Sequence, residues 1–532
     1  MEFLLRFLQF LVKIVYIIVY PILTVLLPQK SNEKKVPPIK KKVLLLPLVE
    51  IIAAMRYRKL TSQQLVQAYI ERIKEVNPLI NAIVEERFED AMVEAKRADD
   101  LLAKCANSQL SQLYTRYPLL GVPFTVKESV GIKGMSHVVG SLKRVGIKAK
   151  IENESVENLR LAGAIPLLVS ANPEYCFSIE TTSYTNGRCL NPYDSRRSSG
   201  GSSGGEGALN GSGATLFGIG SDIAGSIRIP SLFNGVFGHK PTGGLVPING
   251  IFPSSAEAEC AQLLQPGIIT RFGSDLSLLL HVMAGENSVK LGFASAVDTK
   301  EIKVHYSLGF DGLNGFLHHS VMADIQIAIL KAVKYLQQSG LQTKIAKIKG
   351  FHDSNEISFS GIARLKKMSY ILNDNASLKE LLYELTKSIW NGSQYSKEGL
   401  TFELLRRTQA FMFSEDKVAK YKQKGEELKK EVINLLGNNG VLFFPAFPVP
   451  AIHHNTSVLA QWAVDYSLLF NILGLPTTFV PMGLDNQGLP VGFQIIAAPY
   501  NDKLCIQIAG ALEAAFGGWE PPSKYEVAQR QK

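Results

Sequence analysis

The sequence predicts an α/β fold in which a mixed central β-sheet is flanked by helices. Three short apolar runs, at residues 119–126, 164–169 and 215–220, have the length of buried strands and alternate with segments of helical periodicity. The chain has 532 residues, of which 46% are apolar, so it can bury a large core and is not a disordered chain. Chains of this length can form several domains, but we expect one large domain behind an N-terminal hydrophobic segment.

A hydrophobic run of 25 residues near the N-terminus is long enough to cross a bilayer. Arg6, Gln9 and Lys13 interrupt its first half, and Pro21 lies in its second half. No small-residue cleavage site follows the run, so it is not expected to be removed as a signal peptide. We expect residues 1–28 to be a transmembrane helix or, as the alternative, a kinked anchor held in one leaflet or on a lipid droplet.

The next segment, residues 29–42, is predicted to be a basic linker because it contains six lysines around Pro37-Pro38. Residues 1–42 carry eight Lys/Arg and two Asp/Glu, which accounts for +6 of the net charge of +10. A basic excess beside a hydrophobic run favours lipid headgroups as the anionic partner. The rest of the chain has no Lys/Arg cluster with interleaved aromatic residues, so no nucleic acid is expected as a partner.

The folded domain opens with two predicted helices, over residues 60–76 and 87–104. Thr61 and Gln64 have the spacing of a capping box at the start of the first helix, and Asn77-Pro78 is expected to end it. The first predicted strand follows these helices, so the alternation of helices and strands starts here.

A run rich in glycine and serine occupies residues 198–213, where these two residue types fill 12 of 16 positions. Such a composition is most often a flexible linker. Here a buried strand follows the run and leads into a second turn of small residues, at 221–230. Ser202 and Ser226, each preceded by glycine, therefore lie 24 residues apart on either side of one strand. Paired loops of this kind are expected where backbone N–H groups must approach a ligand.

The same run also fits the G-x-S-x-G pattern of a nucleophile elbow, centred on Ser202 or Ser203. An elbow serine should leave a hydrophobic strand directly, but residues 191–197 before the run are polar. We therefore interpret the serines as parts of two ligand-facing loops. An α/β-hydrolase is the alternative, and it would need a catalytic histidine.

Four motifs in a fixed order resemble the amidase signature family. They are GVPFTVKE at residues 121–128, GGSSGGEGAL at 200–209, GSDIAGSIRIP at 220–230 and G-x-x-G-x-K-P-T at 235–242. The resemblance extends from about residue 61 to residue 516. With the hydrophobic N-terminus, the chain is similar in particular to the fatty-acid amide hydrolases of the second, shorter vertebrate type. The resemblance implies that residues 43–532 form one catalytic domain with the amidase signature fold.

The resemblance also implies a Ser-Ser-Lys catalytic triad. Ser226 would be the nucleophile, Ser202 the bridging serine that follows a cis peptide bond, and Lys127 the general base. The backbone N–H groups of four residues would form the oxyanion hole: Ile223, Ala224, Gly225 and Ser226. Three further side chains would hold these loops: Ser203, Asp222 and Arg228. Phe177 would contact the substrate.

Lys127 can act as a base only if it is neutral, whereas a free lysine with a pKa of about 10.4 is almost wholly protonated near neutral pH. Burial lowers the pKa of an ammonium group, so we expect Lys127 to be desolvated at the end of its apolar strand. The structural alternatives are an exposed lysine at a strand end and, for Ser226, a helix N-cap before Ile227. Ala224 occupies a position where many members of the family have glycine, which is tolerated if its φ is negative.

Together, the motifs and the N-terminal segment predict a membrane-bound serine hydrolase that cleaves fatty-acid amides, such as oleamide and N-acylethanolamines, to fatty acid and amine. The resemblance implies no cofactor, and the expected partners are the long-chain amide, membrane lipid and a second copy of the chain in a homodimer. The expected location is the endoplasmic reticulum or the lipid-droplet surface. Two alternatives remain: an amidase or esterase of the same fold for another amphiphile, and a catalytically inactive, membrane-tethered binding protein.

The region from 300 to 440 contains predicted helices near 320–338 and 415–436 but no chemical motif. Residues 402–413 form a basic amphipathic stretch, which we interpret as a surface helix or as a membrane-touching cap at a substrate entrance. The sequence leaves this choice open.

The cysteines and histidines predict no metal site. The five cysteines lack C-x-x-C spacing and are expected to be reduced packing residues. The adjacent pairs His318-His319 and His453-His454 fit no metal motif and are expected at the surface or in loops.

Overall fold

This computed structural model describes residues 2–26, 36–255, 257–292, 299–365, 367–373, 375–390 and 392–523. The end of the predicted membrane segment and most of the predicted basic linker, residues 27–35, lie outside the described residues. Most of the described strands belong to an 11-stranded sheet.

The central sheet is mixed, as the sequence predicts. Its strand order is β1-β3-β2-β6-β8-β7-β12-β13-β11-β9-β10, and β4 and β5 pair separately. β2 runs parallel to β3 and β6, whereas β8 runs antiparallel to β6 and β7. The bounds of the strands are β1 (Ile83–Glu86), β2 (Pro123–Lys127), β3 (Ile165–Ser170), β4 (Thr182–Ser183), β5 (Gly187–Arg188), β6 (Phe217–Asp222), β7 (Phe237–Lys240), β8 (Gln265–Thr270), β9 (Lys303–Tyr306), β10 (Gln342–Ile345), β11 (Gly440–Phe444), β12 (Thr477–Leu484) and β13 (Pro490–Ala497).

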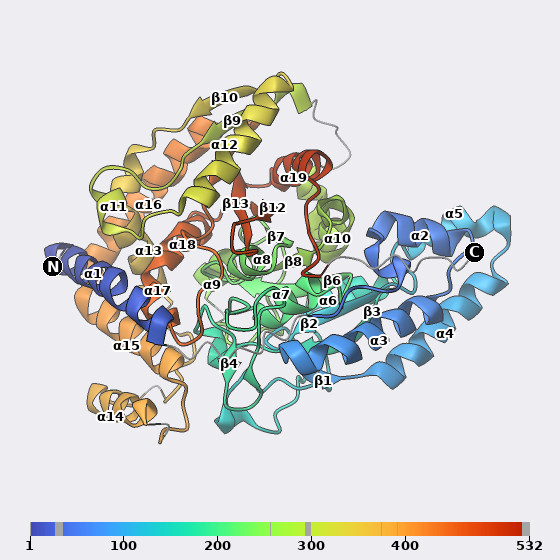
Figure 1. Ribbon diagram of the computed structural model, residues 1–532, viewed down its shortest axis with the longest axis horizontal. Coiled ribbons are helices and arrows are strands. Elements are labelled where there is room, and N and C mark those ends of the chain that lie inside the picture. The colour runs from blue at the N-terminus through green and yellow to red at the C-terminus, as the bar shows by residue number, and fades with distance from the viewer. Residues whose placement is uncertain are drawn as a thin grey trace.

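Helices surround this sheet (Figure 1). Their bounds are α1 (Glu2–Leu26), α2 (Leu48–Arg56), α3 (Ser62–Ile80), α4 (Phe88–Lys104), α5 (Leu110–Arg116), α6 (Glu154–Leu161), α7 (Gly204–Gly211), α8 (Arg228–Asn234), α9 (Ala258–Leu263), α10 (Leu276–Met283), α11 (Gly312–Leu317), α12 (Ala323–Gln338), α13 (Ser354–Ala363), α14 (Leu378–Ile389), α15 (Lys397–Met412), α16 (Glu415–Leu436), α17 (Ser457–Ala460), α18 (Asp465–Ile472) and α19 (Asp502–Phe516). α3 and α4 pack together near one end of the molecule, and α12 and α16 lie at the other.

The first predicted helix, α3, begins with the expected capping box but does not end at Asn77-Pro78. It continues to Ile80, because Asn81 caps it in a left-handed conformation and the Asn77 side chain accepts a hydrogen bond from the N–H of Ala82 at 2.8 Å. A proline in the last turn removes only one helical hydrogen bond, so these caps can keep the turn intact.

The two strands that carry chemistry lie side by side. β2 and β6 are parallel neighbours, so their carboxyl ends lie at the same edge of the sheet. β2 ends at Lys127 and β6 ends at Asp222. All residues of both strands are buried, which explains why both appear in the sequence as short apolar runs. The sheet therefore brings the lysine motif and the second serine loop together.

The N-terminal helix, α1, packs beside α11 and α17 at one side of the molecule (Figure 1). It is 25 residues long and continues through Pro21. Among the helices of the described residues, none is both long and apolar enough to cross a membrane, so the predicted transmembrane helix is not confirmed.

Candidate active site

Lys127 is fully buried at the end of β2. Its Nζ donates hydrogen bonds to the Oγ of Ser202 at 2.7 Å and to the Oγ of Ser221 at 3.0 Å. Burial is the main influence on its pKa and lowers it below the ordinary value for lysine, although Cys176, Asp222 and Glu206 act in the opposite direction. The structure thus excludes the exposed lysine that the sequence left open, and the environment favours a neutral amine.

Ser202 lies in the loop that precedes α7, and its peptide bond with Gly201 is cis. The next residue connects this loop to the second one, because the N–H of Ser203 donates to the carbonyl oxygen of Ser226 at 3.1 Å. The Oγ of Ser203 donates to the carbonyl oxygen of Ser221 at 3.3 Å. The two loops that the sequence predicted as a pair are therefore held side by side.

The loop from Ile223 to Ser226 turns sharply between β6 and α8. Gly225 has a φ of +104°, where a side chain is strained, and a Cβ atom there would lie 2.7 Å from the Cβ of Ser467. Ala224 has no positive φ, so its replacement of glycine is tolerated. Ser226 is half-buried and does not cap α8, because that helix begins at Arg228 with Ile227 as its N-cap.

The backbone N–H groups of this loop are not all available. The N–H of Gly225 already donates to Oδ1 of Asp222 at 2.7 Å, which differs from its predicted place in the oxyanion hole. Within the described part of the chain, the N–H groups of Ile223, Ala224 and Ser226 have no hydrogen-bond acceptor. These three donors can therefore meet an incoming oxyanion without losing another partner.

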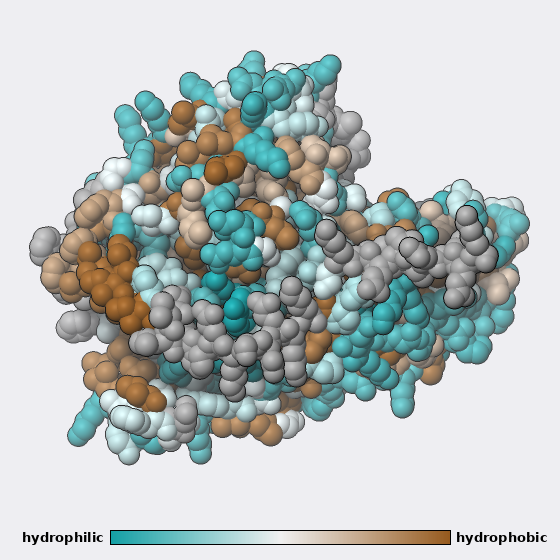
Figure 2. Space-filling view, viewed as in Figure 1, coloured by the Kyte–Doolittle hydropathy of each residue, from teal (hydrophilic) through white to brown (hydrophobic). Residues whose placement is uncertain are grey.

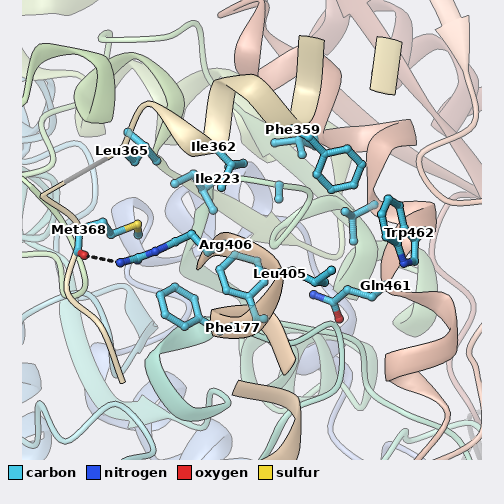
Figure 3. Close-up of a pocket in the computed structure, with 14 residues that line it drawn as sticks. Phe177, Ile223, Phe359, Ile362, Leu365, Met368, Leu405, Arg406, Gln461 and Trp462 are labelled. Carbon is cyan, nitrogen blue, oxygen red and sulfur yellow. Dashed lines mark hydrogen bonds between the residues drawn. The ribbon is translucent and has the colours of Figure 1, made fainter. Parts of the chain in front are cut away.

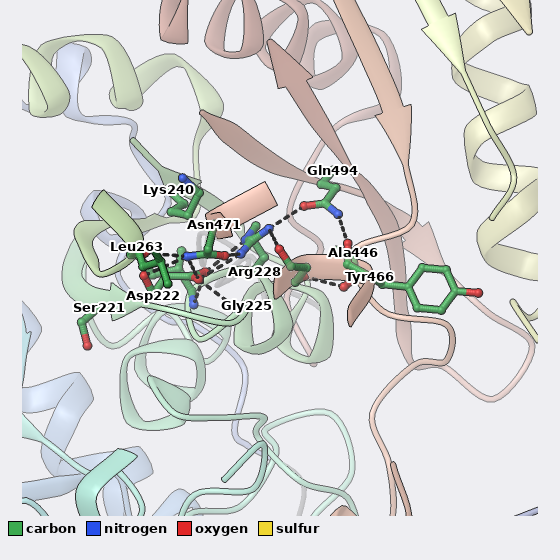
Figure 4. Close-up of polar contacts among 12 residues, drawn as sticks. Ser221, Asp222, Gly225, Arg228, Lys240, Leu263, Ala446, Tyr466, Asn471 and Gln494 are labelled. Atoms are coloured by element: carbon green, nitrogen blue, oxygen red, sulfur yellow. Dashed lines mark hydrogen bonds and ion pairs between the residues drawn. The ribbon is translucent and has the colours of Figure 1, made fainter. Parts of the chain in front are cut away.

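The loop from Ile223 to Ser226, called the oxyanion loop below, packs against a buried ion pair between Asp222 and Arg228 (Figure 4). The Nε and Nη2 atoms of Arg228 donate to the two carboxylate oxygens of Asp222 at 3.1 and 2.9 Å. Nη1 of Arg228 donates to the carbonyl oxygen of Ser467 and to Oε1 of Gln494, both at 2.9 Å. Its remaining N–H group, on Nη2, donates to Oδ1 of Asn471. All five guanidinium N–H groups are therefore used.

Charge and burial oppose each other in this network. Burial alone would raise the pKa of Asp222, but the charge and hydrogen bonds of Arg228 hold it well below its ordinary value, so Asp222 is an anion. Nearby, burial together with the positive charge of Arg228 lowers the pKa of Lys240 to about 7. A buried, satisfied ion pair of this kind fixes the backbone around it rather than adding much net stability.

An apolar cavity opens beside the oxyanion loop (Figure 3). The cavity is narrow, with a volume of about 50 Å³. Ile223 and Ala224 form part of its wall, together with Phe177, Phe359, Ile362, Leu365, Met368, Phe402, Leu405, Arg406, Gln461, Trp462, Val464 and Leu468. The rings of Phe177 and Phe402 stack with centroids 4.5 Å apart. The structure places Phe177 in the wall of this cavity, and its contact with a substrate stays a prediction.

The basic amphipathic stretch at 402–413 lies in α15 except for its last residue, and Phe402, Leu405 and Arg406 of this stretch line the cavity. Arg406 does not present an unpaired charge there, because it donates to the carbonyl oxygens of Met368 at 2.8 Å and Ser369 at 3.2 Å. Its guanidinium also stacks on the ring of Tyr370, 3.6 Å from the centroid. Of the two interpretations of this stretch, the structure therefore disfavours the surface helix, because side chains of the stretch line a cavity.

Three residues beside Lys127 were given no role from the sequence: Ser221 and Glu206, which are buried, and Cys176, which is partly buried. Ser221 accepts the second hydrogen bond of Lys127. Glu206 accepts a hydrogen bond from Oγ1 of Thr125 at 2.6 Å, and burial raises the pKa of this glutamic acid to about 7. Cys176 lies close enough to hydrogen bond with Lys127 and to raise its pKa. Ser221 and Glu206 stand inside the quoted motifs, which was the available signal, whereas nothing local pointed to Cys176.

His318, His319 and His454 lie in loops, one of the two placements expected, but they are buried and not at the surface. Nε2 of His318 lies 2.8 Å from a carboxylate oxygen of Asp465, and Nδ1 of His454 lies 2.8 Å from one of Glu180. Buried carboxylates need such partners, and this requirement is not visible in local sequence. Within the described ranges, no group of His, Cys, Asp and Glu side chains could hold a metal ion.

The chain as a whole is similar to known proteins. The family model described as Amidase matches residues 64–506, most of the chain. The chain belongs to the amidase family. As an amidase it is an amide hydrolase, and the predicted family is confirmed.

Among curated proteins, this amidase is 36% identical over 504 residues to "Fatty-acid amide hydrolase 2" of Homo sapiens, an alignment that covers 93% of this chain and 94% of that protein. It is 37% identical over 531 residues to "Fatty-acid amide hydrolase 2-A" of Danio rerio, which covers 98% of each chain.

Solved structures confirm the amidase signature fold. "Fatty acid amide hydrolase" matches with a TM-score of 0.71 at 20% identity, over 90% of this amidase and 87% of that chain. "Structure of 6-aminohexanoate cyclic dimer hydrolase complexed with substrate" matches with a TM-score of 0.72 at 20% identity, over 90% and 99% of the chains.

Proposed function

We propose that this amidase is a membrane-bound serine hydrolase that cleaves long-chain fatty-acid amides through a Ser226–Ser202–Lys127 triad. The observation that carries the proposal is the buried Lys127, whose Nζ lies 2.7 Å from Ser202 Oγ in the loop bound to Ser226. The names of its relatives support an amide of a fatty acid as the substrate.

In the first step, a proton passes from Ser226 to Ser202 and from Ser202 to the neutral amine of Lys127. The Oγ of Ser226 then attacks the amide carbonyl carbon and forms a tetrahedral oxyanion. The N–H groups of Ile223, Ala224 and Ser226 stabilise this charge, and each such donor is worth about 10²–10³ in kcat.

The second half of the reaction returns the proton. It moves from Lys127 through Ser202 to the leaving nitrogen as the C–N bond breaks, which leaves the acyl group as an ester on Ser226. Water attacks this ester by the same proton path and releases the fatty acid. No step requires a metal or an organic cofactor.

The cavity beside the oxyanion loop is proposed to hold the acyl chain. Its wall is built mainly of aromatic and aliphatic side chains, from α13, α15, α18 and the loops between them and the active site, and the arginine that lines it is satisfied by backbone carbonyls. A hydrocarbon chain is the substrate group that such a wall favours.

Membrane attachment is proposed through residues 1–28, at the endoplasmic reticulum or the lipid-droplet surface. Exposed apolar side chains on α1 support this, and so do Leu378, Leu382 and Trp390 at α14, of which Trp390 is 85% exposed. Residues 43–532 are proposed as the catalytic domain, and a homodimer remains part of the proposal.

The proposal is tested with membranes that contain wild type, Ser226→Ala, Lys127→Ala or Lys133→Ala, and oleamide as substrate. Lys133 is exposed and serves as the matched lysine control. Loss of general-base catalysis should lower kcat of Lys127→Ala by about 10²–10⁴, whereas Lys133→Ala should match wild type.

The alternatives give different results in the same assay. If wild type leaves oleamide intact but a fluorophosphonate still labels Ser226, the substrate class is wrong and another amphiphile is indicated. If folded wild type neither hydrolyses nor labels, the chain is the inactive tethered binding protein.

A further inference from the structure

The polar residues of α1 lie on one side of the helix. Arg6, Gln9, Lys13, Tyr16 and Tyr20 recur at intervals of three or four residues, which is the spacing of one helical face. This face is turned towards the rest of the protein. The residues that interrupt the hydrophobic run therefore form a stripe.

Arg6, Gln9 and Lys13 of this stripe each make a polar contact with the catalytic domain. Nε of Arg6 lies 2.7 Å from Oε1 of the buried Glu356, and Gln9 accepts a hydrogen bond from Asn355 at 2.9 Å. Nζ of Lys13 donates to the carbonyl oxygen of Phe316 at 2.5 Å. These contacts attach the first half of α1 to α13 and α11.

The second half of the stripe continues the same contact through aromatic rings. The ring of Tyr16 meets the ring of His319 edge-on, with centroids 4.4 Å apart. The ring of Tyr20 lies 6.4 Å from that of His453. The helix therefore docks along its length with its polar side inward, the reverse of an ordinary surface helix.

The opposite stripe of α1 is apolar and exposed. It consists of Phe7, Leu11, Ile14, Val15, Ile18 and Ile22, with exposed fractions from 37% to 57%. Figure 2 shows apolar side chains gathered on the side of the molecule where Figure 1 places α1. An apolar surface of this length needs a partner.

We propose that α1 lies in the plane of one lipid leaflet, bound to the catalytic domain by its polar stripe and immersed in lipid by its apolar stripe. This inference rests on the membrane attachment proposed above and not on the triad. A membrane-crossing orientation would pull Arg6 and Lys13 away from their partners and leave the buried Glu356 carboxylate without its ion pair.

Lipid fits this stripe better than a second copy of the chain does. All six of its side chains are hydrocarbon, whereas a protein partner usually meets a polar rim. The apolar residues Leu378 and Trp390 at α14 are exposed as well. The lysines that follow α1 in the sequence supply positive charge for anionic headgroups.

In-plane docking would also couple the lipid surface to the substrate cavity. α13 carries Asn355 and Glu356, which bind α1, and one turn later Phe359 and Ile362, which line the cavity. A substrate that leaves the leaflet would thus meet α13, which lines the cavity and is bound to α1.

The test measures the depth of two labels on full-length protein bound to vesicles of phosphatidylcholine and phosphatidylserine. An environment-sensitive fluorophore is attached at Phe7→Cys or Ile22→Cys in a Cys105→Ser background, and nitroxide lipids of known depth quench it. Tyr57→Cys is the control, because Tyr57 is 72% exposed and directly follows α2, which lies on the opposite side of the molecule from α1 (Figure 1). The unsubstituted background protein reports labelling of its other cysteines.

An in-plane helix places both labels at the same shallow depth, whereas the control label is not quenched. The double variant Ile14→Asp/Ile18→Asp should lower the vesicle-bound fraction about tenfold or more. Arg6→Glu should make the two depths unequal, and Arg6→Glu/Glu356→Arg should restore them.

Three results would overturn the inference. A separation of about 22 Å along the membrane normal would show a crossing helix, given about 1.5 Å per residue over 15 residues. Absence of quenching at both labels would exclude a lipid face. A change from dimer to monomer in Ile14→Asp/Ile18→Asp, without quenching, would assign the stripe to a second copy. Oleamide hydrolysis in detergent, measured in parallel, reports separately on the proposed function.

Discussion

The substitution Arg228→Lys tests how much the buried hydrogen bonds of Arg228 contribute to the position of the oxyanion loop. Arg228 donates five hydrogen bonds, to Asp222, Ser467, Gln494 and Asn471. A lysine ammonium has three donors, so at least two bonds are lost. At about 1–3 kcal/mol for each unsatisfied buried group, the substitution costs about 2–6 kcal/mol. If all 532 residues unfold together, about 1 kcal/mol corresponds to about 1 °C, so Tm should fall by about 2–6 °C.

The assay follows thermal unfolding by intrinsic fluorescence in detergent, with kcat on oleamide measured on the same preparations. Because the network positions the oxyanion donors, kcat of Arg228→Lys should fall by about tenfold or more while KM changes less. Arg97→Lys is the matched control, since Arg97 is exposed and such surface changes stay within about 0.5 kcal/mol. Wild-type Tm and kcat in Arg228→Lys would refute the positioning role.

Three further outcomes follow from the site. Because burial lowers the pKa of Lys127 and only its neutral form accepts a proton, kcat/KM should rise with pH through that lowered pKa, and pH profiles of Lys127→Ala should lack this limb. Phe177→Ala removes the stack on Phe402 and should raise KM for long-chain amides by about 3–10-fold, with a smaller change for short acyl chains in a chain-length series. Gly225→Ala forces a side chain into a left-handed backbone against Ser467 and should abolish fluorophosphonate labelling while the protein still purifies folded.

Much of the site could be predicted from sequence because its parts are local motifs. Lys127 ends an apolar run, and Ser202 and Ser226 lie in turns of small residues on either side of another. The parallel strands β2 and β6 place Lys127 at the edge of the sheet where the loop of Ser226 begins, and parallel pairing is what alternating strands and helices favour. Ser202 joins them through its hydrogen bond with Lys127.

The parts that could not be predicted depend on contacts between distant segments. Asn471 and Gln494 reach Arg228 from more than 200 residues away, and no periodicity marks them. The N–H of Gly225 was expected in the oxyanion hole, but the carboxylate of Asp222 takes it. The end of α3 was misplaced because a side-chain cap outweighed the usual effect of Pro78.

The N-terminal helix shows a different limit of prediction from sequence. Its polar residues were treated as interruptions of a hydrophobic run, although their spacing already formed a stripe. The contacts of this stripe with the rest of the protein, such as those of Arg6 and Gln9 with α13, show that the stripe faces protein. Hydropathy measures how apolar a segment is, whereas docking depends on which side of it is polar.

The central claim is that Ser226 is the nucleophile activated through Lys127. The measurement that tests it most directly is peptide mass spectrometry of wild type and Lys127→Ala after brief exposure to a fluorophosphonate. The account predicts a single adduct on Ser226 in wild type and labelling at least about 100-fold slower in Lys127→Ala. An adduct on Ser202, or equally fast labelling without Lys127, would contradict it.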